Sequence, residues 1–442
     1  MIYFKAFYMK NFYHLLGNSI IASITNFTVW FAITFYSYLQ TRSVLVTGLI
    51  SGIYLVATAV SGFWLGSLVD NYKKKTMMLV SSVVSLGAYI LGLIIYSNTP
   101  QSSFTDPGSP ILWVFIVTLM VGVLVSGIRN IAVPTIVTLI VPPEGRDKAN
   151  GLVGTAFGIS FLVTSVISGL LVGSSGMLWV LILAIIFTTL SIIDLWFIAI
   201  PETEVVHTDG NENKKVDIRG TLKLVSAIPG FMALILFTTF NNFLGGVFMA
   251  LMDAYGLSLV TVEVWGFLWG VLSTGFIIGG LIIAKFGLGK NPLNAMFTAN
   301  IIIWAISSVF TVYPSIIILA VGMFIYLTVV PYIEAAEQTI IQKVVPPERQ
   351  GRVFGFAHSV EQSASPLTAF LIGPLTQFVF IPFMSTGAGV ELIGDWFGTG
   401  PSRGIALVFT ITGIIGLIAT LITRRLKVIQ TLSEAYSRQP KL

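Results

Sequence analysis

The sequence predicts an all-α polytopic membrane protein with twelve transmembrane helices. The first observation is composition, since 55% of the 442 residues are hydrophobic, 10% are charged and the mean hydropathy is +0.90. A soluble protein of this size needs more polar residues to cover its surface. The second observation is a series of uncharged stretches near the roughly 20 residues that a helix needs to cross the hydrocarbon layer, without the alternation typical of strands. Lipid is therefore the expected solvent.

The third observation is an internal repeat, which indicates two pseudo-symmetric halves. Residues 141–146, Val-Pro-Pro-Glu-Gly-Arg, open a glycine-spaced apolar run, and Val-Pro-Pro-Glu-Arg-Gln-Gly-Arg opens another at 345–352. This separation is much longer than the periods of soluble solenoids, and each copy lies between two expected helices. Duplicated membrane segments are typical of transporters, whose sites lie where the repeats meet.

Polar, proline and glycine breaks delimit the twelve expected helices in order. The first half contains 14–39, 45–69, 76–96, 110–140, 149–173 and 177–199, and the second contains 231–256, 262–284, 292–312, 314–342, 353–382 and 404–425. The polar stretch 201–223 carries many acidic and basic residues. We interpret it as a cytoplasmic linker between an N-terminal six-helix bundle, 1–200, and a C-terminal six-helix bundle, 224–442.

Basic residues are distributed unequally between the two sides of this topology. One side has Arg42 and Arg403, whereas the other has Lys73 to Lys75, Arg146, Lys148, Lys214, Lys215, Arg219, Lys285, Lys290, Lys343, Arg349, Arg352, Arg424, Arg425 and Lys427. The positive-inside rule then places both termini in the cytoplasm of a cell with this protein in its plasma membrane. Attraction to anionic lipid explains the formal charge of +5 better than a nucleic-acid partner does. We also expect the first apolar segment to be retained rather than cleaved.

Residues that would support an enzyme are scarce. Cysteine is absent, the three histidines are scattered at 14, 207 and 358, and no phosphate-binding glycine-rich loop ends in lysine and serine or threonine. An ATP-driven pump is therefore disfavoured. We expect no catalytic residues, no metal and no cofactor.

The loop after the second expected helix carries a motif. Gly66 precedes Asp70 by four residues, and the basic cluster 73–75 follows. This pattern resembles the signature loop of the major facilitator superfamily. Within that family, the stretch 342–355 is similar to proton-driven drug exporters that include bacterial macrolide efflux proteins and a siderophore exporter.

The resemblance implies the major facilitator fold, whose central cavity opens alternately to either side of the membrane. We expect gating residues at Gly66, Asp70, Lys74, Lys75 and Arg352. The Asp70 carboxylate can lie against the positive N-terminus of the helix that begins near Gly351 and hold the cytoplasmic side closed. Paired glycines, such as Gly62 with Gly66 and Gly351 with Gly355, allow helix backbones to approach closely.

Ionisable residues within the expected helices are candidates for proton coupling. Each costs about 2.5–3.5 kcal/mol on insertion scales, so each should face protein or water. Glu334 and Glu337 share one helical stripe, and one of two such close acids is expected to hold a proton near neutral pH. Superimposing the repeats places Arg129 beside this pair as a countercharge; the alternative is a static ion pair. Glu361 and Asp253 are further candidates; for Asp253, contact with water at the outer side is the favoured alternative, and Asp194 is expected at the inner interface.

Polar and aromatic side chains predict the surface that contacts substrate. The expected set is Asn26, Trp30, Asn130, Asn241, Asn242, Met249, Gln338 and His358. Amide, thioether and aromatic groups with few charges suit bulky lipophilic molecules better than sugars or phosphates. For single aromatic and methionine residues, packing between helices is an equal alternative.

Together these features favour a secondary active transporter that exports lipophilic or amphipathic small molecules, such as drugs, by proton antiport. Its expected partners are substrate, protons and membrane lipid, and we expect a monomer. Export of a siderophore or lipid-like metabolite is the main alternative. A non-transporting receptor and a membrane enzyme follow further behind.

Overall fold

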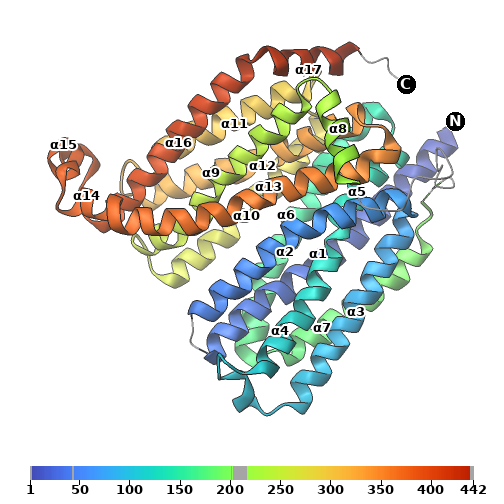
Figure 1. The fold of residues 1–442 in the computed structure, drawn as a ribbon, viewed down its shortest axis with the longest axis horizontal. Helices are drawn as coiled ribbons and strands as arrows, with labels where there is room; N and C mark the ends of the chain where they lie inside the picture. Colours follow the sequence, from blue (N-terminus) through green and yellow to red (C-terminus); the bar gives the residue numbers. More distant parts are fainter. Residues whose placement is uncertain (1, 42–43, 201, 203–216, 439–442) are drawn as a thin grey trace. The chain divides into compact units, whose positions relative to one another are not determined.

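The computed structural model describes residues 2–41, 44–200, 202 and 217–438, which are almost entirely helical (Figure 1). Eleven helical segments in these ranges are long and apolar enough to cross a membrane. The 30-residue helix α6 (Arg146–Ser175) lies where the remaining expected segment was predicted. The predicted all-α polytopic fold with twelve transmembrane helices is therefore confirmed.

The observed helices match the expected segments to within a few residues at most ends. Those of the first half are α1 (Ile2–Thr41), α2 (Val44–Asn71), α3 (Lys74–Asn98), α4 (Pro110–Ser126), α5 (Ile128–Ile140), α6 and α7 (Leu178–Phe197). Those that follow are α8 (Ile218–Ala227), α9 (Phe231–Leu257), α10 (Val262–Phe286), α11 (Pro292–Val309), α12 (Ile316–Val344), α13 (Gln350–Leu375), α14 (Ile381–Ser385), α15 (Ala388–Phe397), α16 (Pro401–Arg425) and α17 (Lys427–Arg438). The short helices α8, α15 and α17 were not predicted.

The expected segment 110–140 is interrupted at Gly127, between α4 and α5. The Gly127 amide bonds to the Leu124 carbonyl, and the Asn130 amide bonds to the Gly127 carbonyl, so the turn tightens locally. Pro134 lies inside α5 and cannot donate a backbone hydrogen bond. The break places Arg129 and Asn130 in the first turn of α5.

The expected segment 353–382 is also irregular. Pro366 and Pro374 lie inside α13, and a π-helical turn at Thr376–Phe380 joins α13 to α14. Prolines remove backbone donors, and π turns absorb the resulting change of register.

The described residues form two compact units. Unit 1 contains 1–221 and 341–359, and unit 2 contains 222–340 and 360–442. The last residues of α12 and the first ten of α13 thus pack with unit 1. The division into six-helix bundles at 1–200 and 224–442 stays a prediction, and most of the expected linker, 201 and 203–216, lies outside the described residues.

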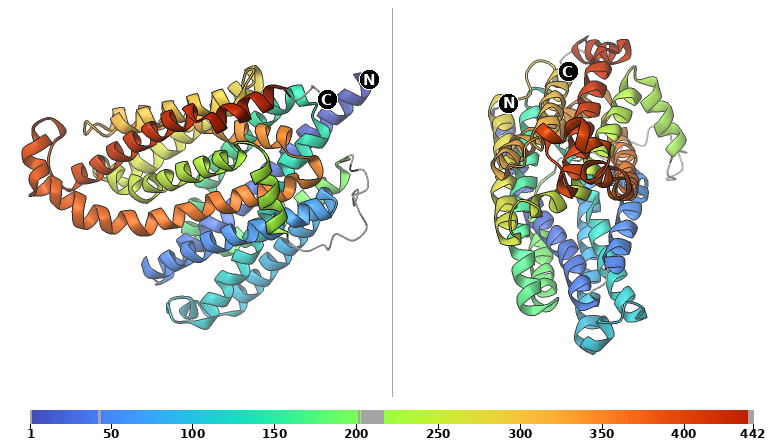
Figure 2. Two further views of the ribbon diagram at one scale, coloured as in Figure 1. Left: turned by 45° about the horizontal axis from the view of Figure 1, so that its top comes forward. Right: turned by 90° about the vertical axis from the view of Figure 1, so that its left-hand side faces the viewer.

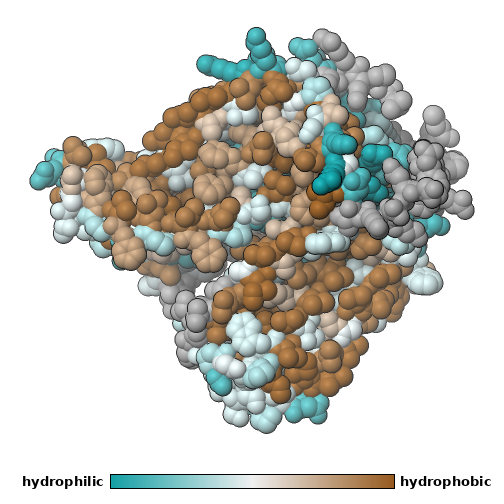
Figure 3. Space-filling view, in the orientation of Figure 1, coloured by the Kyte–Doolittle hydropathy of each residue, from teal (hydrophilic) through white to brown (hydrophobic). Residues whose placement is uncertain are grey.

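Each unit has its own apolar core. In unit 1, α3 packs against α4 and α7, and the core includes the aromatic rings of Tyr36, Tyr89 and Phe115. In unit 2, α11 packs against α16 (Figure 2). The core of this unit includes Phe248, Trp304 and Phe409. The outward faces of the helices remain largely hydrophobic, whereas hydrophilic side chains gather near α8 and α17 (Figure 3). Such faces are expected where lipid, rather than water, contacts the helices.

Candidate functional site

A polar pocket lies within unit 1. It has an empty volume of about 640 Å³, which is partly open to solvent. Its polar lining comprises Ser23, Asn26, Tyr54, Thr58, Ser61, Ser126, Arg129, Asn130 and His358. Four residues singled out in the sequence, at 26, 129, 130 and 358, thus meet here although they come from three helices. No carboxylate occurs among the described lining residues.

Arg129 is buried at the start of α5, with 6% of its surface exposed. Its Nη1 donates to Asn18 Oδ1 at 2.8 Å, and its Nη2 donates to Ser82 Oγ at 3.0 Å and Ser191 Oγ at 3.2 Å. These acceptors come from α1, α3 and α7, so three helices position one guanidinium. All three acceptors are neutral.

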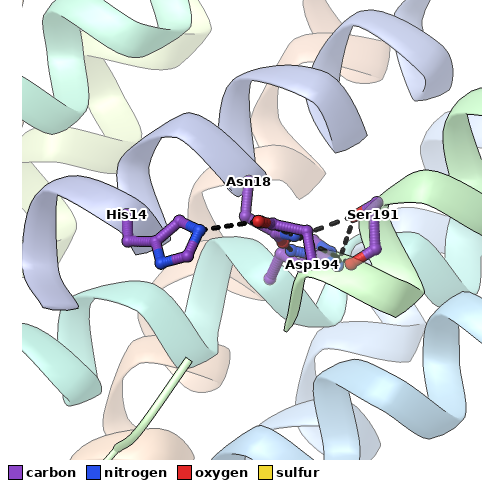
Figure 4. Close-up of polar contacts among 5 residues, drawn as sticks. His14, Asn18, Ser191 and Asp194 are labelled. Carbon is purple, nitrogen blue, oxygen red and sulfur yellow. Dashed lines mark hydrogen bonds and ion pairs between the residues drawn. The ribbon is translucent and has the colours of Figure 1, made fainter. Parts of the chain in front are cut away.

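Asn18 connects Arg129 to a carboxylate at the surface of unit 1. Its Nδ2 donates to Asp194 Oδ2 at 2.8 Å, and Asp194 Oδ1 lies 2.6 Å from His14 Nε2 (Figure 4). The side chains of His14 and Asp194 are 46% and 31% exposed. The sequence placed Asp194 at an interface but did not connect it to Arg129; the one available signal was the helical spacing of Asn18 and Asn26. The pairing of Arg129 with Glu334 and Glu337 stays a prediction.

Three carboxyl groups gather within unit 2. Glu334 and Glu337 lie on α12 and Glu361 lies on α13, with Glu337 and Glu361 within hydrogen-bonding reach of each other. Glu334 interacts electrostatically with both. Thr238 Oγ1 of α9 donates to Glu361 Oε1 at 2.6 Å. Glu334 is exposed, whereas the other two are partly buried.

We call these three acids the acid cluster. Among the described residues, no lysine, arginine or histidine forms an ion pair with any of them. Two neighbouring carboxyl groups can form a hydrogen bond only when one of them holds a proton, because an ionised carboxylate only accepts. The geometry therefore suits a site that binds a proton. Glu361 was a separate candidate in the sequence, and the structure brings it to the predicted pair.

Asp253 has a different environment near the end of α9. Its Oδ1 accepts hydrogen bonds from Trp265 Nε1 at 2.9 Å and Trp269 Nε1 at 3.1 Å. The carboxylate is exposed and lies outside the acid cluster's contacts. Its predicted part in proton coupling remains untested.

The remaining predicted substrate residues divide between packing and exposed positions. Asn241 accepts from Trp304 Nε1 at 2.6 Å and donates to the Phe237 carbonyl, so its amide is occupied within unit 2. Trp30 stacks on Tyr54, with ring centroids 3.8 Å apart. No hydrogen bond is described for the side chains of Asn242, Met249 and Gln338. Asn242 is partly buried, Met249 is 80% exposed, and Oε1 of Gln338 is buried.

Asp70 at the end of α2 contacts the first turn of α13. Its Oδ1 accepts from the Gly351 amide at 2.6 Å, and its Oδ2 accepts from the Arg352 amide at 2.8 Å. The Arg352 Nε lies 3.6 Å from Oδ2, and its Nη2 donates to Asn71 Oδ1 at 3.1 Å. This is the contact that the sequence predicted between Asp70 and the helix beginning near Gly351.

Glycines make this contact geometrically feasible. A Cβ added to Gly355 would collide with the Gly62 carbonyl and lie 2.9 Å from the Gly66 Cα. A Cβ added to Gly351 would collide with the Asp70 carboxylate. The two helices therefore touch backbone to backbone, as the glycine spacing indicated.

Glu202 binds the start of α3, the helix that follows Asp70 and α2 in the chain. Its carboxylate accepts from the amides of Lys74 and Lys75, at 2.6 and 2.8 Å. Lys75 Nζ also donates to the Trp196 carbonyl. A carboxylate at a helix N-terminus satisfies unpaired amides and complements the helix dipole. Sequence reasoning did not find this role, because Glu202 and Lys74 are far apart in the chain.

The family model described as Major Facilitator Superfamily matches residues 15–369. The chain belongs to the major facilitator superfamily. Macrolide efflux protein A of Streptococcus pyogenes is 22% identical to it over 374 residues, which cover 81% of this chain and 88% of that protein. Macrolide efflux protein A of Enterococcus faecalis is 21% identical over 323 residues, or 70% and 94% of the two chains.

Solved structures share the fold at low identity. The human organic anion transporter MFSD10 has a TM-score of 0.69 and 11% identity, covering 93% of this chain and 99% of that one. A bacterial homologue of the iron transporter ferroportin, in an outward-facing state, has a TM-score of 0.68 and 13% identity, covering 94% and 100%. This major facilitator superfamily member is therefore a multi-pass membrane transporter of small molecules, and not an enzyme.

Proposed function

We propose that the protein exports lipophilic or amphipathic small molecules, such as drugs, in exchange for protons. The observation that carries this proposal is the acid cluster of Glu334, Glu337 and Glu361. Glu337 and Glu361 are partly buried and have no described cationic partner, which favours the neutral form, and the neighbouring Glu334 reinforces that preference. Near neutral pH, such a cluster gains and loses a proton more readily than a carboxylate that is paired with a basic side chain.

Proton occupancy of the acid cluster is the proposed link to alternating access. A proton shared by Glu337 and Glu361 joins α12 to α13, and its loss leaves two carboxylates that repel each other. Repulsion favours a conformation in which these helices are further apart or hydrated. Arg129 is the proposed countercharge in the deprotonated state.

The direction and substrate class are supported by two observations. The named relatives are macrolide efflux proteins, which favours export of lipophilic drugs. The predicted substrate residues are amides, aromatic rings and a thioether, a lining that suits large molecules with few charges. A monomer in the plasma membrane with both termini in the cytoplasm completes the proposal.

The Asp70 contact is the proposed cytoplasmic gate. With Gly66, Lys74, Lys75 and Arg352 around it, Asp70 holds the first turn of α13 while that side is closed, and the contact breaks when the cavity opens inward. A helix N-terminus favours an anion by up to about 2 kcal/mol in partly buried geometries, enough to bias a conformational equilibrium without locking it.

Inverted vesicles test the proton coupling. Dye and macrolide transport, with ethidium and erythromycin as probes, is measured with and without an imposed pH gradient. We expect Glu334→Gln, Glu337→Gln and Glu361→Gln each to reduce gradient-dependent transport by about tenfold or more, within the usual range of coupling energies. Glu348→Gln is the matched control, because Glu348 is exposed and lies outside the acid cluster. Full gradient dependence in all three cluster variants, or none in the wild type, refutes the proposal.

A further inference from the structure

We propose that the pocket of unit 1 binds an anionic group of the transported molecule, a carboxylate or its equivalent, through Arg129. This inference rests on the proposed transport function and adds a preference for those transported molecules that carry such a group. It assigns Arg129 a direct contact with the ligand, in addition to its proposed exchange of charge with the acid cluster.

The first reason is that Arg129 is a buried cation with only neutral acceptors. A guanidinium stays charged in proteins, and a charge removed from water is stabilised chiefly by an opposite charge. Asn18, Ser82 and Ser191 contribute amide and hydroxyl oxygens. In the ranges that the structure describes, no carboxylate forms an ion pair with Arg129. Asp194 acts on the guanidinium electrostatically from beyond ion-pair distance, so an anion that entered the pocket would supply a direct countercharge.

The second reason is that Arg129 retains donor capacity beside the pocket. A guanidinium has five N–H groups, and the described hydrogen bonds of Arg129 engage Nη1 once and Nη2 twice. None of these described hydrogen bonds uses Nε, and Arg129 belongs to the pocket lining. The Nε hydrogen and one Nη1 hydrogen are thus left to donate to an anion, each as a separate charge-assisted hydrogen bond.

The third reason is the chemistry of the pocket around the guanidinium. Asn26 and Asn130 line the same pocket. The Asn26 Oδ1 is buried and accepts no hydrogen bond from any described residue. An amide can present a donor or an acceptor to a ligand, since its two ends are interchangeable by rotation. No described lining residue is acidic, so nothing in the pocket opposes an anion.

Asp194 tunes the charge of this site from outside the pocket. It reaches Arg129 only through Asn18, which donates to the carboxylate and accepts from the guanidinium. This arrangement partly neutralises the cation without occupying its pocket face. Removing the Asp194 charge should therefore strengthen anion binding, whereas removing the Arg129 charge should abolish it.

A pair of dyes that differ by one carboxylate tests the site. Rhodamine B has a free carboxylate, and rhodamine B ethyl ester does not. The binding of each dye to the full chain in nanodiscs is measured by fluorescence anisotropy. Empty nanodiscs give the partition of the dyes into lipid, which is subtracted. We expect the wild type to bind the acid at least about tenfold more tightly than the ester, or about 1.4 kcal/mol. Arg129→Gln should bring this ratio close to one, and Arg129→Lys should retain part of it. Lys148→Gln, an exposed cation of α6, should leave the ratio unchanged.

Asp194→Asn gives an independent result that leaves Arg129 in place. We expect the acid-to-ester ratio to rise above the wild-type value. Three results would each overturn the proposal. The first is equal or absent binding of both dyes by the wild type. The others are a preference for the acid that survives in Arg129→Gln and a ratio that does not rise in Asp194→Asn. Because binding is measured without a pH gradient, a failure here is distinct from a failure of proton-coupled export, which the vesicle assay detects.

Discussion

Replacing Asp70 by asparagine isolates the charge at the contact between α2 and α13. The carboxylate uses both oxygens to accept from the amides of Gly351 and Arg352. Asparagine has one side-chain oxygen, so its NH₂ group must face one of these N–H donors. The substitution keeps the shape of the side chain but removes one hydrogen bond and the attraction to the helix N-terminus.

The expected magnitude follows from the burial of this contact. Asp70 is 7% exposed, so the attraction lies near the upper value of about 2 kcal/mol for a charge at a helix terminus. At 1.4 kcal/mol for each factor of ten, this corresponds to about a thirtyfold shift. We expect Asp70→Asn to shift the equilibrium by this factor toward conformations in which the contact is broken, and to slow transport.

Electron–electron distance measurements can test this shift, because the chain has no cysteine of its own. Spin labels at Tyr72→Cys and Pro347→Cys, both exposed positions that flank the contact, report whether it is closed. Asp106→Asn is the control, since Asp106 is an exposed acid that accepts from the Gly108 amide in the loop before α4. An unchanged distance distribution in Asp70→Asn, or an equal change in the control, would show that this carboxylate does not hold the contact.

Two further substitutions test the packing of the helices. Gly355→Ala should lower the melting temperature of the purified protein through a loss of about 1–3 kcal/mol in the free energy of unfolding, because the new methyl group meets the backbone of Gly62. Gly373→Ala, on the same helix α13, is the control, because its methyl group meets no atom within 4 Å and should have little effect. Similar losses in both variants would contradict the close approach of the helices. Asn241→Leu should lower the free energy of unfolding by about 1–3 kcal/mol, because it leaves the buried Trp304 N–H unpaired. In a Trp304→Phe background the same substitution should cost less, because this N–H is absent. Strictly additive losses in that double variant would argue against the hydrogen bond.

Most transmembrane segments could be predicted because their signal is local. Hydrocarbon thickness sets the length of each helix, so apolar runs between breaks located α2, α3, α9 and α16 to within a few residues. The Asp70 contact was also accessible, since a carboxylate at one helix end and a glycine-rich start of another are both visible in the chain. The break at Gly127 was missed because a glycine in an apolar run is also common in unbroken transmembrane helices.

The sequence alone determined that this protein is a helical membrane transporter, because composition and motifs are properties of the chain itself. Only the tertiary structure decided which polar groups meet: Arg129 with Asn18, and Glu337 with Glu361. Helices that are apolar on nearly every face carry little sequence signal for their rotation about their own axes. That rotation decides whether a polar side chain faces lipid, a neighbouring helix or a pocket.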